Sequence, residues 1–159
     1  MTLMDAQQYD DTRDRRRRNL IIIGVFVVLI LAWLTYHLRN YPERHAAAKF
    51  FSALQHRDIE GAYALWMKDP DWKQHPEKYS KYPLGQFTVD WGPSSEYGAI
   101  TSHRIDCALE PPKKDFASPT GVVVVVIINN RAEPRSMWVE KKSKTISDSP
   151  VSVACHGAQ

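Results

Sequence analysis

The sequence predicts an α+β fold: one apolar helix near the N-terminus, then a domain in which helices come first and an antiparallel sheet follows. Three observations predict it. An uncharged run of 20 residues extends from Asn19 to Leu38. Apolar residues then recur at helical spacing up to Trp91, and beyond Gly92 β-branched runs and alternating patterns replace them. With 159 residues, the chain has room for one domain of ordinary size beside the apolar helix.

The uncharged run is predicted to be a transmembrane helix over residues 19–38. Thirteen of its residues are Leu, Ile, Val or Phe, and as a helix it would rise about 30 Å, the thickness of a bilayer's hydrocarbon core. A buried core helix is the alternative, but it would have to be apolar on every side within a small domain. A cleaved secretory signal is a second alternative, and it would need a shorter apolar region with a small-residue site close behind.

An arginine-rich segment precedes the apolar run and predicts its orientation. We assign these residues to topology and to lipid headgroups: Arg13, Arg15, Arg16, Arg17 and Arg18. By the positive-inside rule, residues 1–18 form a cytoplasmic basic tail and residues 39–159 an exported α+β domain. The expected location is the inner (cytoplasmic) membrane of a bacterium, with the domain periplasmic or extracytoplasmic. Residues 39–159 hold 16 basic and 14 acidic residues, so we expect no nucleic-acid partner.

The first half of the exported domain reads as three helices. Pro42 suits a first helical turn, and apolar spacing predicts a helix over 42–55. Asp58 is a plausible N-cap for a second helix that ends before Asp69. Residues 69–83 hold three prolines among aromatic residues and read as a loop held down by those aromatics. A short third helix is expected over 83–91, with a strand as its alternative.

The second half reads as strands. Residues 97–110 alternate and predict a long strand with an irregularity near its middle. Val122 to Ile128 are seven consecutive β-branched residues, which predicts a strand covered on both faces. Asn129 to Arg131 is expected to connect a hairpin, residues 135–142 form the next strand, and a last strand is expected near 151–154.

Both cysteines, Cys107 and Cys155, lie in the exported domain. In an oxidising compartment they are candidates for a disulfide that ties the end of the domain to its middle. The alternative is one buried thiol and one exposed thiol near a frayed end. Cys155 and His156 could also ligate a metal, but no second cluster with ligand spacing accompanies them, so we expect no metal.

The segment from Ala46 to Tyr63, with its two helices, short connection and Ala62-Tyr63 pair, resembles the start of nuclear-transport-factor-two-like (cystatin-like) domains. The resemblance covers residues 42–154 in element order. It implies a curved sheet wrapped around helices into a cone, and in bacteria such domains often stand outside the membrane on a single helix. Some members are isomerases or dehydratases with an acid in the pocket, and many bind partners.

An isomerase-like site would need an acid or a His/Asp pair inside an apolar cone. The candidates are Asp90, His103 and Asp106. Asp90 is expected to be solvated or capping, and the other two lie three apart on a strand, so they leave opposite faces unless a bulge intervenes. The sequence holds no phosphate-binding loop, nucleophile elbow or haem-attachment motif. We therefore expect no catalytic residue and no cofactor.

Aromatic residues carry the remaining functional signal. Most of them could fill the core, but Trp72, Tyr79 and Tyr82 lie in a loop poor in aliphatic residues, which predicts an exposed patch that binds a protein partner. The expected function is that of a non-catalytic, single-pass accessory or assembly subunit of a larger membrane protein complex. Its expected partners are the lipid bilayer and other membrane protein subunits. The alternative is a membrane-tethered cone domain that binds a small ligand or acts as an isomerase.

Overall fold

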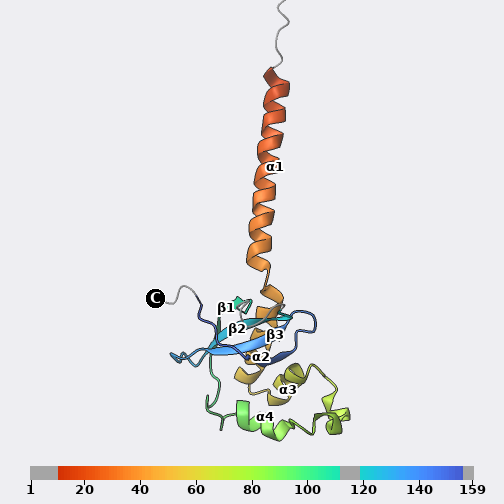
Figure 1. Cartoon of the computed structure of the whole chain (residues 1–159), viewed down its shortest axis with the longest axis vertical. Helices are drawn as coiled ribbons and strands as arrows, with labels where there is room; N and C mark the ends of the chain where they lie inside the picture. The colour runs from red at the N-terminus through yellow and green to blue at the C-terminus, as the bar shows by residue number, and fades with distance from the viewer. Residues whose placement is uncertain (1–10, 112–118, 156–159) are drawn as a thin grey trace, which may run out of the picture. The chain divides into compact units, whose positions relative to one another are not determined.

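The computed structural model describes residues 11–111 and 119–155, without the side chains of residues 11–14 and 37. The side chain of Arg13 and the whole of His156 therefore lie outside the described part of the chain. The chain divides into two compact units that meet between Arg39 and Asn40. Figure 1 shows the apolar helix of the first unit and the helices and strands of the second.

The first unit is the helix α1, Asp11–Leu38. It begins eight residues before the predicted span, so the arginines at 15–18 lie on the same helix as the apolar run and are exposed. Its large apolar side chains are 41% to 76% exposed from Leu20 to Leu38. Within the described residues, this helix is long and apolar enough to cross a bilayer, and its apolar window is not buried.

The second unit begins with the helices α2, Tyr41–Gln55, and α3, Ile59–Met67. Pro42 lies in the first turn of α2, where its missing N–H costs nothing. Asp58 is the N-cap of α3, and its carboxylate accepts a hydrogen bond from the Gly61 backbone N–H at 2.8 Å. Both predicted helices, and the predicted cap between them, are confirmed.

Two short 3-10 helices, η1 (Trp72–Gln74) and η2 (Pro76–Tyr79), lead to the helix α4, Leu84–Trp91. The third predicted helix is thus confirmed, and its strand alternative is wrong. Rings from α2, α3 and α4 meet edge to face or tilted. Phe50 contacts four of them at centroid distances of 5.1 to 6.2 Å: Phe51, the partly buried Trp66, Phe87 and Trp91. These rings form the helical half of the core.

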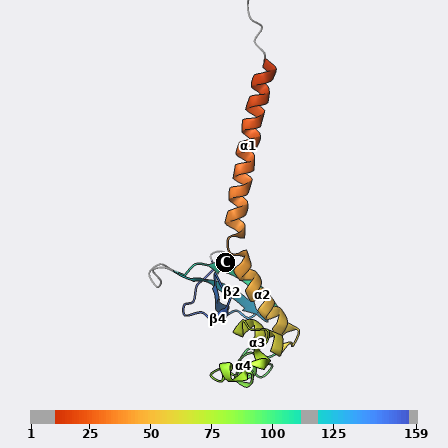
Figure 2. The same ribbon diagram turned by 90° about the vertical axis from the view of Figure 1, so that its right-hand side faces the viewer.

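The strands form one antiparallel sheet in the order β1-β2-β3-β4, with β1 His103–Leu109, β2 Gly121–Ile128, β3 Arg135–Glu140 and β4 Ile146–Asp148. Helix α2 packs against β1, β2 and β3, α3 contacts β4, and α4 packs against α3 (Figure 2). The predicted α+β class is confirmed, as is the buried strand, because residues 121–126 of β2 are all buried.

The irregularity expected in the first strand is a bulge. Ile105 pairs with Val126 and Cys107 with Val125, so Asp106 is the extra residue. Two predicted boundaries are wrong. Residues 97–102 are not a strand, because the side-chain amide of Asn129 forms hydrogen bonds with backbone N–H and C=O groups of this segment. The last strand is β4 at 146–148, and not at 151–154 as predicted. Lys144 turns the chain with a φ of 58°, so the strand begins earlier.

A disulfide joins Cys107 to Cys155, with 5.8 Å between their Cα atoms. Directly opposite residues of an antiparallel pair share a face, so Cys107 lies on the same face as Val125. The face of β2 that carries Val124 and Val126 belongs to the core with α2. The disulfide therefore holds the end of the described chain on the second face of the sheet.

Candidate functional site

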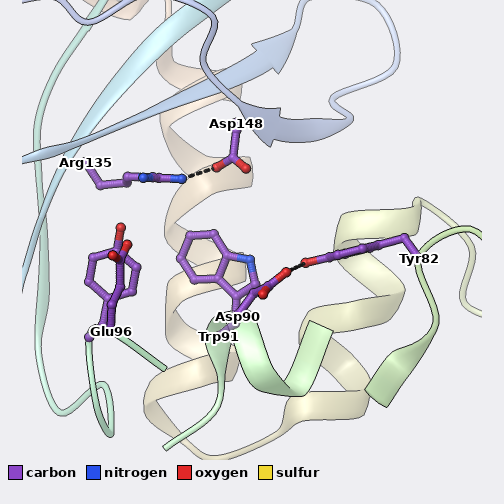
Figure 3. A pocket seen from close by; sticks show the side chains of 7 residues that line it. Tyr82, Asp90, Trp91, Glu96, Arg135 and Asp148 are labelled. Carbon is purple, nitrogen blue, oxygen red and sulfur yellow. Dashed lines mark hydrogen bonds and ion pairs between the residues drawn. The ribbon is translucent and has the colours of Figure 1, made fainter. Parts of the chain in front are cut away.

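A polar pocket of about 310 Å³ lies where the end of α4 faces the ends of β3 and β4. Its lining comes from five segments of the chain and consists of Tyr82, Asp90, Trp91, Glu96, Tyr97, Arg135 and Asp148. Figure 3 shows the Arg135 and Asp148 pair on one side, the Asp90 and Tyr82 pair on the other, and the indole of Trp91 between them. This pocket is the candidate functional site.

The α4 side of the polar pocket is organised by Asp90. Its carboxylate accepts a hydrogen bond from the Tyr82 hydroxyl at 2.7 Å and another from the Gln86 side-chain amide at 3.0 Å. Burial, and then the bond to Asp90, raises the pKa of Tyr82 well above its usual value. Tyr82 therefore keeps its proton and acts as a fixed donor that orients the carboxylate.

The sheet side is organised by Arg135. Its Nη2 donates to the Asp148 carboxylate at 2.6 Å, a charge-assisted bond between neighbouring strands. Its Nε is buried and has no hydrogen-bond partner among the described residues. An unused buried donor of this kind gains free energy when an acceptor reaches it. The Nε of Arg135 is thus a buried donor that the described residues leave unused.

Aromatic rings form the remaining wall. Trp91 is 4% exposed, and its ring stacks on Tyr97 with 5.7 Å between centroids and 15° between planes. Burial of Tyr97, together with its bond to Glu96, raises its pKa to about 12. Tyr97 is therefore neutral at ordinary pH, and its hydroxyl serves as a donor rather than as a base.

The charge and protonation of the lining decide which groups the polar pocket suits. Three carboxylates face one guanidinium, so the formal charge of the lining is negative. Both tyrosines hold their protons, and neither is poised to accept one at neutral pH. Such a site suits a positively charged group, or one rich in hydrogen-bond donors, held against the indole face. Among residues 11–111 and 119–155, no three His, Cys, Asp or Glu side chains are grouped as a metal ion requires.

The structure separates the three acid–base candidates. Asp90 lines the polar pocket, hydrogen-bonded and half-buried. His103 lies elsewhere, with its Nδ1 3.0 Å from the Gln55 side-chain oxygen and its ring stacked on Phe51. The bulge does not bring Asp106 to His103, because the Asp106 carboxylate pairs with Arg104 at 3.5 Å. No His/Asp dyad forms from these residues.

The expected aromatic patch is not an exposed one. Trp72, Tyr79 and Tyr82 are each half-buried and pack against the core. The ring of Tyr63 contacts both Trp72, at 4.9 Å, and Tyr79, at 6.3 Å, and the Tyr79 hydroxyl donates to Asp69 at 2.5 Å. These aromatics hold the 69–83 loop down, as the sequence predicts for the loop itself. Their role in partner binding stays a prediction, and only Tyr82 reaches the polar pocket.

Sequence reasoning missed most of the polar pocket. The sequence does not single out four of its residues, because they lie in separate segments and form no local motif: Glu96, Tyr97, Arg135 and Asp148. One signal in the sequence points to the polar pocket. Arg135 begins the predicted 135–142 strand and Asp148 follows that strand, so an antiparallel hairpin would bring their side chains together.

No protein family, curated protein or solved structure matches the chain. The resemblance to nuclear-transport-factor-two-like domains, and the cone that it implies, therefore stay predictions. What the structure shows is the α+β class, the long apolar helix and the four-stranded antiparallel sheet.

Proposed function

We propose that the chain is a single-pass membrane protein, anchored by α1 with its N-terminus in the cytoplasm, whose exported domain is a non-catalytic accessory or assembly subunit of a larger membrane complex. The observation that carries the proposal is the apolar surface of α1. Its large apolar side chains from Leu20 to Leu38 are 41% to 76% exposed. Apolar surface on this scale requires cover by lipid or protein.

Two further features support the orientation. Arg15 to Arg18 are exposed on α1 just before the apolar run, as the positive-inside rule requires of a cytoplasmic end. The disulfide between Cys107 and Cys155 lies in the other unit, and structural disulfides are typical of oxidising compartments outside the cytoplasm.

The polar pocket supports a binding role for the domain. A negative, aromatic-walled site of about 310 Å³ can hold the basic side chain of a partner protein. The same volume supports the second candidate, a tethered domain that binds a small cationic ligand. The two candidates differ in what stays bound when the full chain is purified.

The anchor and its orientation are tested in cells that express the full chain. We expect the protein to stay in the membrane after alkaline carbonate washing, with residues 1–38 still present by intact mass. Protease added to spheroplasts should digest the domain and leave the N-terminal segment protected. A soluble product that lacks the apolar run would instead show a cleaved signal and contradict the proposal.

The subunit role is tested by purifying the full chain in a mild detergent. We expect a stoichiometric complex with other membrane proteins, weakened by Glu96→Lys, which inverts one charge in the polar pocket. Glu77→Lys is the matched control, because Glu77 is an exposed acid on η2 that does not line the polar pocket. A lone monomer that retains a small molecule would favour the second candidate.

A further inference from the structure

A second cavity, which we call the basic groove, lies on the α2 side of the domain and has a volume of about 300 Å³. Its charged lining includes Lys49, Lys68 and Lys144, and its apolar lining includes Ala46, Leu65 and Ile146. None of these residues lines the polar pocket. The basic groove thus combines ammonium groups with an apolar floor, a pairing that suits an amphiphile with an anionic head.

The charge of the basic groove is only partly neutralised by the protein. Lys144 Nζ donates to the Glu43 carboxylate at 2.5 Å, so its charge is balanced. Lys49 and Lys68 have no carboxylate partner among the described residues, and both are exposed. Two lysines without a carboxylate partner among the described residues therefore line one cavity, and an anion is the complementary ligand.

The backbone places two of these lysines at positions that glycine normally takes. Lys68 ends α3 with a φ of 57°, and Lys144 turns the chain before β4 with a φ of 58°. A side chain at such a φ is less favourable than glycine. At position 144 the ion pair with Glu43 already gives the charge a use, and at position 68 an anion in the basic groove would give it one.

The covalent chain sets an upper limit on the distance between Ala46, in the basic groove, and the end of the apolar helix. Helix α1 ends at Leu38 and α2 begins at Tyr41, and Ala46 lies in the second turn of α2. At about 3.5 Å for each linking residue and 1.5 Å for each helical residue, Ala46 lies within about 20 Å of Leu38 whatever the orientation of the two units. Lipid headgroups at the end of a membrane-spanning α1 are therefore within reach.

We propose that the basic groove binds the headgroup of an anionic phospholipid, with its phosphate between Lys49 and Lys68 and the first carbons of its chains over Ala46, Leu65 and Ile146. This proposal rests on the membrane anchoring proposed above. The proposal adds a specific lipid contact to the one expected of the arginines that precede the apolar run. The two contacts are distinct, because the residues of the basic groove all follow the apolar run in the sequence.

The test uses the full chain reconstituted into vesicles of phosphatidylcholine alone or with phosphatidylglycerol. A membrane-impermeant, amine-reactive reagent labels exposed lysines, and mass spectrometry reads each site. We expect labelling of Lys49 and Lys68 to fall about fivefold with phosphatidylglycerol, the change that about 1 kcal/mol for each lysine at an anionic surface implies. Lys81 and Lys142, exposed and outside the basic groove, are references within the same molecule.

A matched pair of variants sharpens the test. Lys68→Gly removes one charge at a position whose φ suits glycine, so the fold is kept, and most of the about fivefold protection of Lys49 should be lost. Lys81→Gln removes a charge outside the basic groove and should leave protection of Lys49 unchanged. Equal protection in the two variants would overturn the proposal.

The remaining outcomes separate this proposal from the function on which it rests. A chain that does not float with the vesicles overturns both. A chain that floats, with Lys49 and Lys68 labelled equally in the two lipid mixtures, overturns the lipid site alone. Protection by millimolar inorganic phosphate in phosphatidylcholine vesicles would show a site for free anions and would also overturn it.

Discussion

At the scale of single residues, Glu43 stands out as the buried charged side chain of the described part of the chain, at 4% exposure. One carboxylate oxygen accepts from Lys144, and the other is buried without a hydrogen-bond partner among the described residues. Lys144 also donates to the backbone oxygen of Lys141. This contact links the first turn of α2 to the turn before β4 across 101 residues, so the ion pair joins the two ends of the domain.

Removal of the lysine should leave an uncompensated buried carboxylate. We expect Lys144→Met to lower the free energy of unfolding of the full chain by about 3 kcal/mol, measured by urea denaturation in detergent. Lys142→Met is the matched control, because Lys142 is an exposed lysine in the same turn, and it should change stability by less than about 0.5 kcal/mol. Equal denaturation midpoints for the two variants would show that the pair contributes nothing.

His103 gives stability a dependence on pH. Burial lowers its pKa from the usual 6.5, so the folded domain favours the neutral ring and the unfolded chain binds the proton more readily. Stability is therefore full above about pH 6.5 and falls as the pH drops toward the lowered pKa of the folded state. His103→Asn should remove this loss, measured as unfolding free energy between pH 7 and pH 5, and parallel curves for the two proteins would refute the assignment.

At the scale of elements, Asn129 explains why the first strand is short. Its side-chain oxygen accepts from the backbone N–H of Thr101, at 2.8 Å, and of Ser102, at 3.2 Å. Its side-chain nitrogen donates to the backbone oxygens of Tyr97 and Ala99 at 3.1 and 3.0 Å. One side chain thus takes the hydrogen-bonding groups that a strand ladder would have used, and the alternation of residues 97–102 does not reveal it.

The neighbouring asparagine offers a close control. Asn129 and Asn130 both have a positive φ, 52° and 55°, so glycine fits the backbone at either position. We expect Asn129→Gly to cost about 2 kcal/mol of unfolding free energy through its lost side-chain bonds. Asn130→Gly should be neutral or stabilising by up to about 1 kcal/mol. A thermal unfolding series on the two variants checks this, and equal losses would contradict the role of Asn129.

Elements with local signals were predictable from the sequence. Helix α3 followed from the Asp58 cap and apolar spacing, and β2 from its β-branched run, because propensity and burial there agree. The strand predicted at 151–154 is wrong because the turn at Lys144, which starts β4 earlier, depends on its tertiary bond to Glu43. The polar pocket has no local signal for the same reason, since Arg135 joins Asp90 and Tyr82 only through the sheet.

At the scale of the whole molecule, the disulfide ties the end of the described chain to the second face of the sheet. Helix α2 packs on the face of β2 that carries Val124 and Val126, and Cys107 lies on the other face with Val125. Val123 and Val125 are buried as well, at 0% and 1% exposure. The segment that ends at Cys155 is therefore tied to the face that α2 does not cover.

Loss of the disulfide should both destabilise the domain and uncover that face. For a separation of 48 residues, the double variant Cys107→Ser/Cys155→Ser should lose about 4 kcal/mol of unfolding free energy and bind more of a hydrophobic dye. Wild-type protein treated with reductant is the control and should match the variant. Identical electrophoretic mobility of wild-type protein with and without reductant would show that Cys107 and Cys155 do not form a disulfide.

The order of the strands has a consequence for synthesis. Each strand of the sheet pairs with the next strand along the chain, so pairing partners appear in the order in which the ribosome makes them. When the β-branched run of β2 emerges, β1 is already present as a template, and the time in which seven aggregation-prone residues stay unpaired is short. The cysteine at 155 arrives last and closes a structure that is otherwise assembled.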